Sequence, residues 1–256
     1  MKVFFVVLAR DRSAVDRKVK ELSELGYPYI IVCGERISHP NVAYREPKGK
    51  YDAINFGLRF VPQNVDVVAL NDVDNKIYNF GAMLKHFDSK DVALAFARIS
   101  VKEGPQKFFN VILDAIRRKL PIASNGDLML VRQGVLRHIL PIKPCKAEDS
   151  YILFKVLELK LGIVFCEECY VKTEKTKHDR EEEAYKRRTV CGLYQALAFT
   201  KPPVAIRMFY TLLPIASPLL LVLGKKGYFW MKGILLGLRD FLGGDRRGFW
   251  HPTLMD

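Results

Sequence analysis

The chain has 256 residues, of which 49% are hydrophobic and 27% charged. This composition excludes a disordered or collagen-like chain and provides enough apolar material for one large α/β domain or two small ones. Lys and Arg (41) exceed Asp and Glu (28) by 13, which favours anionic partners such as nucleotides, phospholipids or nucleic acid without choosing among them. Five cysteines are too few, and odd in number, for a disulfide framework, so we expect a reducing, cytoplasmic setting.

The chain opens on a short apolar run, Val3 to Ala9, which predicts a buried β-strand because Val and Phe dominate it. A basic n-region and a cleavage site are missing, so we expect no signal peptide. Strand-like and helix-like stretches then alternate, which favours a mainly parallel sheet covered by helices, with ligands beyond the carboxyl ends of the strands. The predicted strands are Val3–Ala9, Tyr29–Cys33, Val65–Leu70, Val92–Ala97, Leu128–Val131 and Ile163–Cys166. The predicted helices are Ala14–Leu25, Tyr51–Phe60, Asn79–His86, Lys107–Lys119, Ser150–Leu159 and Glu181–Leu197.

The C-terminal part differs in composition from the rest of the chain. Val204–Leu223 is almost entirely apolar and would span roughly 30 Å as a helix, but Pro214 and Pro218 would kink or break it. Tyr228–Leu242 mixes apolar, aromatic and basic residues at helical spacing, as a helix in the membrane interface does. We therefore expect residues 1–200 to form the main domain and residues 201–256 a hydrophobic, basic, membrane-associated region. The alternative is a helical subdomain packed on the main domain.

The central motif is the pair Asp72 and Asp74, which follows an apolar strand and so falls at the carboxyl edge of the predicted sheet. Two carboxylates one residue apart can hold Mg²⁺ or Mn²⁺ together with the phosphate oxygens of a ligand. Asp is also a common turn former, so on its own this motif indicates a turn more often than a metal site.

Three further segments carry charged side chains that could bind a phosphate or accept a proton from a sugar hydroxyl. Lys48-Gly49-Lys50 precedes a helical stretch and suits a phosphate, or is a solvated basic loop. Asp149 either caps the helix that follows it or serves as a general base, with a pKa expected near the reference of about 3.9. The arginines near residue 188 could steady a leaving diphosphate, or form a solvated helix face.

The sequence also contains Cys166-Glu167-Glu168-Cys169, a single C-x-x-C within a strand-like run. It lacks the second pair of ligands that a structural zinc site needs, and it does not begin a helix as redox pairs do. We therefore expect packing cysteines. There is no H-E-x-x-H, G-x-S-x-G, Walker A or G-x-G-x-x-G motif.

The order of these motifs is more informative than any one of them. An acid after the second strand, Gly-Lys before a helix, Asp-x-Asp, Glu-Asp and then an arginine cluster with Gly-x-x-Gln resemble the family 2 inverting glycosyltransferases, especially membrane-associated, cellulose-synthase-like members. The resemblance covers residues 3–200 and continues to the basic-aromatic tail 246–253. It implies a GT-A fold, a mixed and mainly parallel sheet with helices on both faces, followed here by C-terminal membrane-associated helices.

The resemblance also implies roles for individual residues. Asp149 would be the catalytic base that accepts the proton of the acceptor hydroxyl. Asp72 and Asp74 would bind Mg²⁺ or Mn²⁺ and, through it, the diphosphate of a UDP- or GDP-sugar. The other donor-binding residues would be Ala9, Asp11, Glu35, Lys50 and Arg188, and the acceptor-side residues Asn125, Gly126, Asp127 and Glu148.

The sequence departs from the family pattern at the last motif, where Tyr185 and Thr189 replace its glutamine and tryptophan. Since those residues grip a growing polymer in processive members, we expect a single transfer to a lipid-linked or membrane-proximal glycan acceptor at the cytoplasmic face of the membrane. One alternative is a sugar-phosphate nucleotidylyltransferase, although the loop after the first strand lacks the glycines it would need. The other is a non-enzymatic basic module that binds nucleic acid or membranes. We expect no nucleic-acid partner, because aromatic residues do not interleave with basic ones in the strands.

Overall fold

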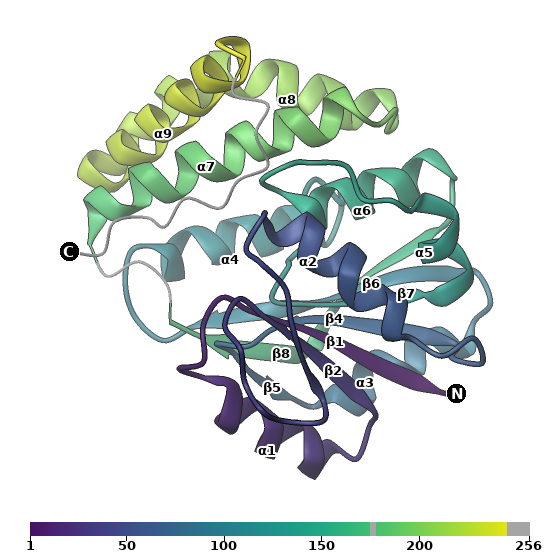
Figure 1. Cartoon of the computed structure of the whole chain (residues 1–256). Coiled ribbons are helices and arrows are strands. Elements are labelled where there is room, and N and C mark those ends of the chain that lie inside the picture. The colour runs from purple at the N-terminus through teal and green to yellow at the C-terminus, as the bar shows by residue number, and fades with distance from the viewer. Residues whose placement is uncertain (175–177, 245–256) are drawn as a thin grey trace.

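One mixed sheet of eight strands forms the centre of the protein in the computed structural model, which describes residues 1–174 and 178–244 (Figure 1). In spatial order the strands are β3 (Val42–Tyr44), β2 (Tyr29–Cys33), β1 (Val3–Ala9), β4 (Val67–Asp72), β7 (Leu128–Arg132), β6 (Val92–Val101), β8 (Gly162–Thr173) and β5 (Lys76–Tyr78). The first four are parallel, β7 is antiparallel to both β4 and β6, β8 is parallel to β6, and β5 is antiparallel to β8. The mixed, mainly parallel sheet predicted from the sequence is confirmed.

This topology brings two loops together at one edge of the sheet. β1 and β4 end side by side there, with Leu8 paired to Asp72. Because β7 runs in the opposite direction, it begins where β4 ends, and Asn71 pairs with Leu128. Residues 124–127, which lead into β7, therefore lie beside the Asp-x-Asp motif that follows β4.

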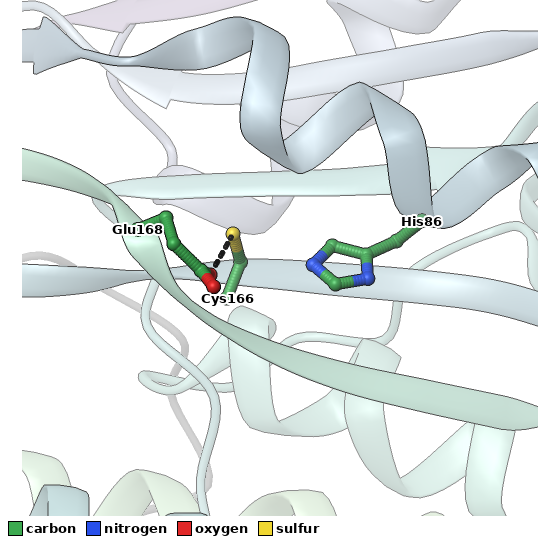
Figure 2. A group of neighbouring side chains, drawn as sticks. All are labelled: His86, Cys166 and Glu168. Atoms are coloured by element: carbon green, nitrogen blue, oxygen red, sulfur yellow. Dashed lines mark hydrogen bonds between the residues drawn. The ribbon is translucent and has the colours of Figure 1, made fainter.

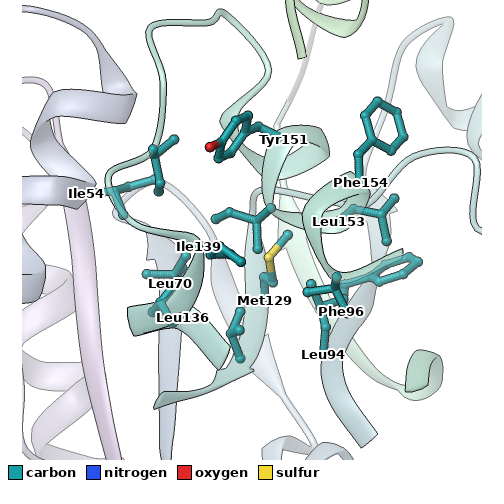
Figure 3. Close-up of a cluster of buried hydrophobic side chains, with 14 of the residues drawn as sticks. Ile54, Leu70, Leu94, Phe96, Met129, Leu136, Ile139, Tyr151, Leu153 and Phe154 are labelled. Carbon is teal, nitrogen blue, oxygen red and sulfur yellow. The ribbon is translucent and has the colours of Figure 1, made fainter. Parts of the chain in front are cut away.

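Helices cover both faces of the sheet, as Figure 1 shows. In β1, Phe4, Val6 and Leu8 enter one apolar core while the alternate residues enter the other, which explains why this strand is apolar throughout. Figure 3 shows the first core, where strand residues such as Met129 meet helix residues such as Phe154. α1 (Val15–Leu25), α3 (Phe80–Lys85) and the 3₁₀ turn η2 (His86–Asp88) cover one face. The other carries α2 (Lys50–Gly57) with η1 (Leu58–Phe60), α4 (Gln106–Arg117), α5 (Gln133–Ile139) and α6 (Glu148–Glu158).

The six predicted strands and six predicted helices are present, with bounds that shift by a few residues. Three elements had no sequence signal. β3 and β5 have three residues each, too few for a period-2 pattern, and α5 makes only two turns. β8 is the largest extension, since it continues through the C-x-x-C segment to Thr173.

A layer of C-terminal helices lies over α4 and α6 (Figure 1). It consists of α7 (Asp179–Ala198), α8 (Val204–Ala216), the 3₁₀ segment η3 (Ser217–Leu223) and α9 (Gly224–Leu242). This layer contains helices from both sides of the predicted boundary between residues 200 and 201, since α9 packs along α7. Two ion pairs join these helices, Arg187 with Asp240 and Lys232 with Glu183.

The break predicted at the prolines is present at Pro218, because α8 ends at Ala216, whereas Pro214 lies inside α8 and does not end it. With 13 residues α8 is about 20 Å long, less than the roughly 30 Å of a bilayer core. By length and composition alone, the stretch Val204–Leu242 is apolar enough to cross a membrane. The basic-aromatic tail at 246–253 lies outside the described residues.

Candidate active site

Three carboxylates meet at the edge of the sheet where β4 ends. Asp72 is the last residue of β4, Asp74 lies in the turn that follows, and Asp127 comes from the loop before β7. One oxygen of each lies within 4.8 Å of the others. An oxygen-only donor set of this kind suits Mg²⁺ or Mn²⁺. Asp127, predicted on the acceptor side, thus lies beside Asp72 and Asp74, the two acids predicted to bind the metal.

The loops that carry these acids are fixed by buried amides. The side chain of Asn75 donates to the carbonyl of Asp127 (2.7 Å), and Asn71 donates to Asn75 (2.9 Å) and to the same carbonyl. Buried Lys18, on α1, donates to the carbonyl of Asn75 (2.6 Å). Sequence reasoning missed these three residues. The position of Asn71 and Asn75 directly beside the Asp-x-Asp motif could have indicated them, whereas no sequence signal pointed to Lys18.

Lys50 joins the acidic group to the start of α6. Its ammonium lies 2.9 Å from both oxygens of Asp72 and 3.0 Å from Glu148, which is buried. Although burial opposes the charge, these two carboxylates raise the pKa of Lys50 well above its ordinary value. A cation already sits among the acids, at the position predicted to face the phosphates of a donor.

The two carboxylates with the largest shifts lie on either side of this lysine. Burial raises the pKa of Asp72 to about 7; Lys50 opposes the shift, and Asp74 and Asp127 add to it. Burial, followed by the charge of Glu148, raises the pKa of Asp149 to about 6. The expectation that Asp149 titrates near its reference value is therefore wrong, because that value describes a solvated carboxyl with no acidic neighbour.

Gly126 lies beside both Lys50 and Asp149. A Cβ added at Gly126 would lie 3.2 Å from the nitrogen of Lys50 and 3.4 Å from an oxygen of Asp149, so a side chain there would crowd both groups. The neighbouring Asn125 donates to the carbonyl of Ala97 (3.0 Å) and accepts from the backbone of Asp127. Both ends of its side chain are used inside the protein, so Asn125 shapes the loop.

The other predicted donor residues lie at the ends of β1 and β2. Ala9 ends β1, and Asp11 accepts hydrogen bonds from the hydroxyl (2.5 Å) and the backbone of Ser13, which lower its pKa. Exposed Glu35 accepts a hydrogen bond from the backbone N–H of Arg12 (3.3 Å), so the two acids sit on adjoining loops. The structure therefore brings Asp11 and Glu35 together at one end of the same sheet edge.

Arg188 lies on α7, the helix that supports the loop before α6. Gln195 accepts a hydrogen bond from the backbone of Lys146 (2.9 Å), and Gly192 lies against Ala147. Arg188 precedes Gly192 by one turn and so lies on the same face of α7. Its predicted contact with a diphosphate remains a prediction.

We expect Gly192→Ala to destabilise the protein by about 1–3 kcal/mol, since its Cβ would lie 2.6 Å from the backbone nitrogen of Ala147. Thermal unfolding measures this. Gly81→Ala on α3 is the matched control, because nothing lies within 4 Å of a Cβ there. Equal melting temperatures of the two variants would show that α7 does not press on this loop.

No protein-family model and no curated protein matches this sequence. Solved structures do match its fold. A mannosyltransferase from Pyrobaculum calidifontis, solved with GDP-mannose and Mn²⁺, aligns over 93% of this chain and 86% of its own, with a TM-score of 0.66 and 16% identity. The glycosyltransferase GalNAc-T7, solved with UDP, GalNAc and Mn²⁺, aligns over 96% of this chain and 56% of its own, with a TM-score of 0.58 and 11% identity. The chain therefore has the GT-A fold of the nucleotide-sugar-dependent glycosyltransferases.

Proposed function

We propose that the protein is an inverting glycosyltransferase that moves a sugar from a UDP- or GDP-sugar to a lipid-linked or membrane-proximal glycan acceptor. The observation that carries the proposal is the arrangement of Asp72, Asp74 and Asp127 beside Lys50 and Asp149. The relatives of the same fold that were solved with a nucleotide or a nucleotide-sugar and Mn²⁺ add support. The motif order supports membership of family 2 and its cellulose-synthase-like branch.

The residues divide the chemistry of one direct displacement. Mg²⁺ or Mn²⁺ held by the three acids would neutralise charge on the leaving nucleoside diphosphate. Lys50 and Arg188 add fixed positive charge on that side. Asp149, beside Gly126, accepts the proton of the acceptor hydroxyl as it attacks the anomeric carbon. One displacement inverts the configuration at that carbon.

An outward-facing apolar side of α4 supports a lipid-linked acceptor. Phe108, Val111 and Ile112 are exposed, while Asp114 and Arg117, on the inner side, are buried and paired at 2.9 Å. α4 also buries Phe109 and packs Leu113 and Ile116 on the core, so it is apolar on its outer side as well as its inner side, which a helix in water normally is not. At the end of α4, a cavity of about 470 Å³ has apolar and charged walls. Its lining includes Phe96, Ile163, Phe165, Arg117, Lys119 and the ion pair of Arg118 with Glu167.

A second apolar stripe supports membrane binding at the cytoplasmic face. Exposed apolar side chains recur at helical spacing along α8 and η3, and exposed lysines follow at 225 and 226. This pattern is typical of a helix lying in the interface of an anionic bilayer. The stripe consists of Met208, Leu212, Ile215, Leu219 and Val222.

The double variant Ile215→Glu, Leu219→Glu is expected to lower binding to anionic vesicles at least about tenfold, because burial of each side chain contributes about 1.5–3 kcal/mol. Co-sedimentation with vesicles measures it. Gln63→Glu, an exposed change outside the stripe, is the control. Equal binding of both proteins would mean that the stripe does not touch the membrane.

The proposed activity is tested by hydrolysis of UDP-, GDP- and dTDP-sugars with Mn²⁺ or Mg²⁺. We expect release of the nucleoside diphosphate from one donor, and only with metal. Cleavage to a nucleoside monophosphate or a sugar phosphate would instead favour a nucleotidylyltransferase. Failure to bind or cleave any donor would leave the non-enzymatic basic module as the better reading.

A further inference from the structure

A second group of ligand-type side chains lies apart from the three acids, between η2 and β8. It consists of His86, Cys166 and Glu168, which lie side by side in Figure 2. One ligand atom of each lies within 4.8 Å of the others, and the thiol of Cys166 donates to the Glu168 carboxylate over 3.6 Å. None of the three takes part in the proposed transfer.

An irregularity of β8 creates this group. Along β6, Ala97 pairs with Cys166 but the next residue, Arg98, pairs with Tyr170, so residues 167–169 leave the ladder. Arg98 donates to the carbonyl of Glu167 (3.3 Å), which fixes one end of this bulge. Asn79 donates to the carbonyl of Glu168 (3.1 Å), which fixes its middle. The bulge is therefore held in place by groups outside it.

The backbone of the bulge is directed at the sulfur of Cys166. The N–H of Cys169 donates to this sulfur (3.4 Å). Hydrogen bonds from backbone N–H groups favour a sulfur that carries negative charge, as a metal-bound thiolate does. Packing alone needs no such donors.

We propose that His86, Cys166 and Glu168 bind Zn²⁺. Imidazole, thiolate and carboxylate are the three protein ligands that Zn²⁺ takes, and tetrahedral bonds to them place the ligand atoms about 3.5 Å apart. The sulfur and the carboxylate already have this separation. Binding replaces the S–H bond of Cys166 by a sulfur–zinc bond and releases one proton to the solvent. One thiolate and one carboxylate then balance the two charges of the ion.

The fourth position is assigned to water, because Glu168 lies at the surface. The sulfur of Cys169 is not in the ligand group, although both cysteines are fully buried in the same apolar core. The bound ion would link η2 to the bulge of β8 and so hold two segments that are far apart in the sequence.

Zinc binding to the purified chain is measured by competition with a chromogenic chelator, and Co²⁺ is used as a spectroscopic probe. We expect one tight zinc site and a cobalt spectrum with the charge-transfer band of a single thiolate. Cys166→Ser, His86→Ala and Glu168→Gln should each weaken zinc more than about 100-fold, beyond the loss caused by removing an outer-shell partner. Glu168 is exposed, so its variant tests the site without disturbing the core.

Two controls separate this site from its neighbours. Cys169→Ser should keep zinc affinity within a few-fold, and Asp74→Ala should leave it unchanged, because the three acids of the candidate active site are a different group. The proposal is overturned if the unmodified protein binds no zinc, if Cys169→Ser removes zinc as fully as Cys166→Ser, or if Co²⁺ shows no thiolate band.

Discussion

Asp74→Ala is expected to lower metal-dependent transfer about 10³-fold or more, because the metal ion stabilises several kcal/mol of charge on the leaving diphosphate. Asp74 is exposed and its side chain pairs with no cation at short range in the described ranges 1–174 and 178–244, so the fold should not change. The measurement is initial rate against Mn²⁺ concentration. Glu24→Gln, an exposed carboxylate on α1, serves as the control and should keep full activity.

Asp127→Asn separates the two roles given to Asp127. As a metal ligand, it should raise the Mn²⁺ concentration needed for half-maximal rate and leave the KM for the acceptor unchanged. If Asp127 is instead an acceptor-side residue, the variant should raise the KM for the acceptor and leave the Mn²⁺ concentration for half-maximal rate unchanged. If Asp74→Ala keeps full activity and Asp127→Asn changes only the KM for the acceptor, the proposal that these acids bind a metal ion is contradicted.

Asp149→Asn is expected to lower transfer by about 10²–10⁴-fold, the usual contribution of a general base, while binding of the donor is retained. The pH profile gives a sharper test. Asp149 must be unprotonated to accept a proton, and its pKa is raised to about 6. At saturating Mn²⁺, which keeps Asp72 ionised, the rate should therefore be level above pH 7 and fall about tenfold per unit well below pH 6.

Glu148→Gln tests the cause of this fall in rate at low pH, the acid limb of the pH profile. The charge of Glu148 raises the pKa of Asp149, and Lys50 lowers it. Removing the charge of Glu148, which also pairs with Lys50, should shift the acid limb to lower pH. A limb that does not move, or an Asp149→Asn enzyme with near-normal rate, would contradict the assignment of the base. An acceptor that is already ionised, such as a lipid phosphate, would also leave Asp149→Asn active.

The elements that could be predicted from the sequence are those whose burial leaves a periodic pattern. β1, β2 and β4 are covered on both faces and so read as continuous apolar runs. The break before Pro218 was predictable for a local reason, since proline lacks the N–H that a helix interior uses, although Pro214 lies within α8 without ending it. The three-residue strands β3 and β5 exist only because neighbouring strands pair with them, and no local pattern reports that.

The candidate site was predictable where one motif follows one strand, as Asp72 and Asp74 do. The place of Asp127 was not, because it depends on β7 running antiparallel to β4. The raised pKa of Asp149 likewise arises from burial and from a neighbour, Glu148, whose position is fixed only in the folded chain. The group of Cys166 and Glu168 with His86 could not be predicted either, because His86 lies eighty residues earlier in the sequence and only the fold brings it there.

The central claim is that a cation held by Asp72, Asp74 and Asp127 joins this chain to the diphosphate of its donor. Calorimetric titration with UDP and GDP, each with and without Mn²⁺, tests it most directly. The account predicts tight binding of one nucleotide that requires Mn²⁺ and is lost in Asp74→Ala. Nucleotide binding of equal affinity without metal, or undiminished in Asp74→Ala, would contradict it.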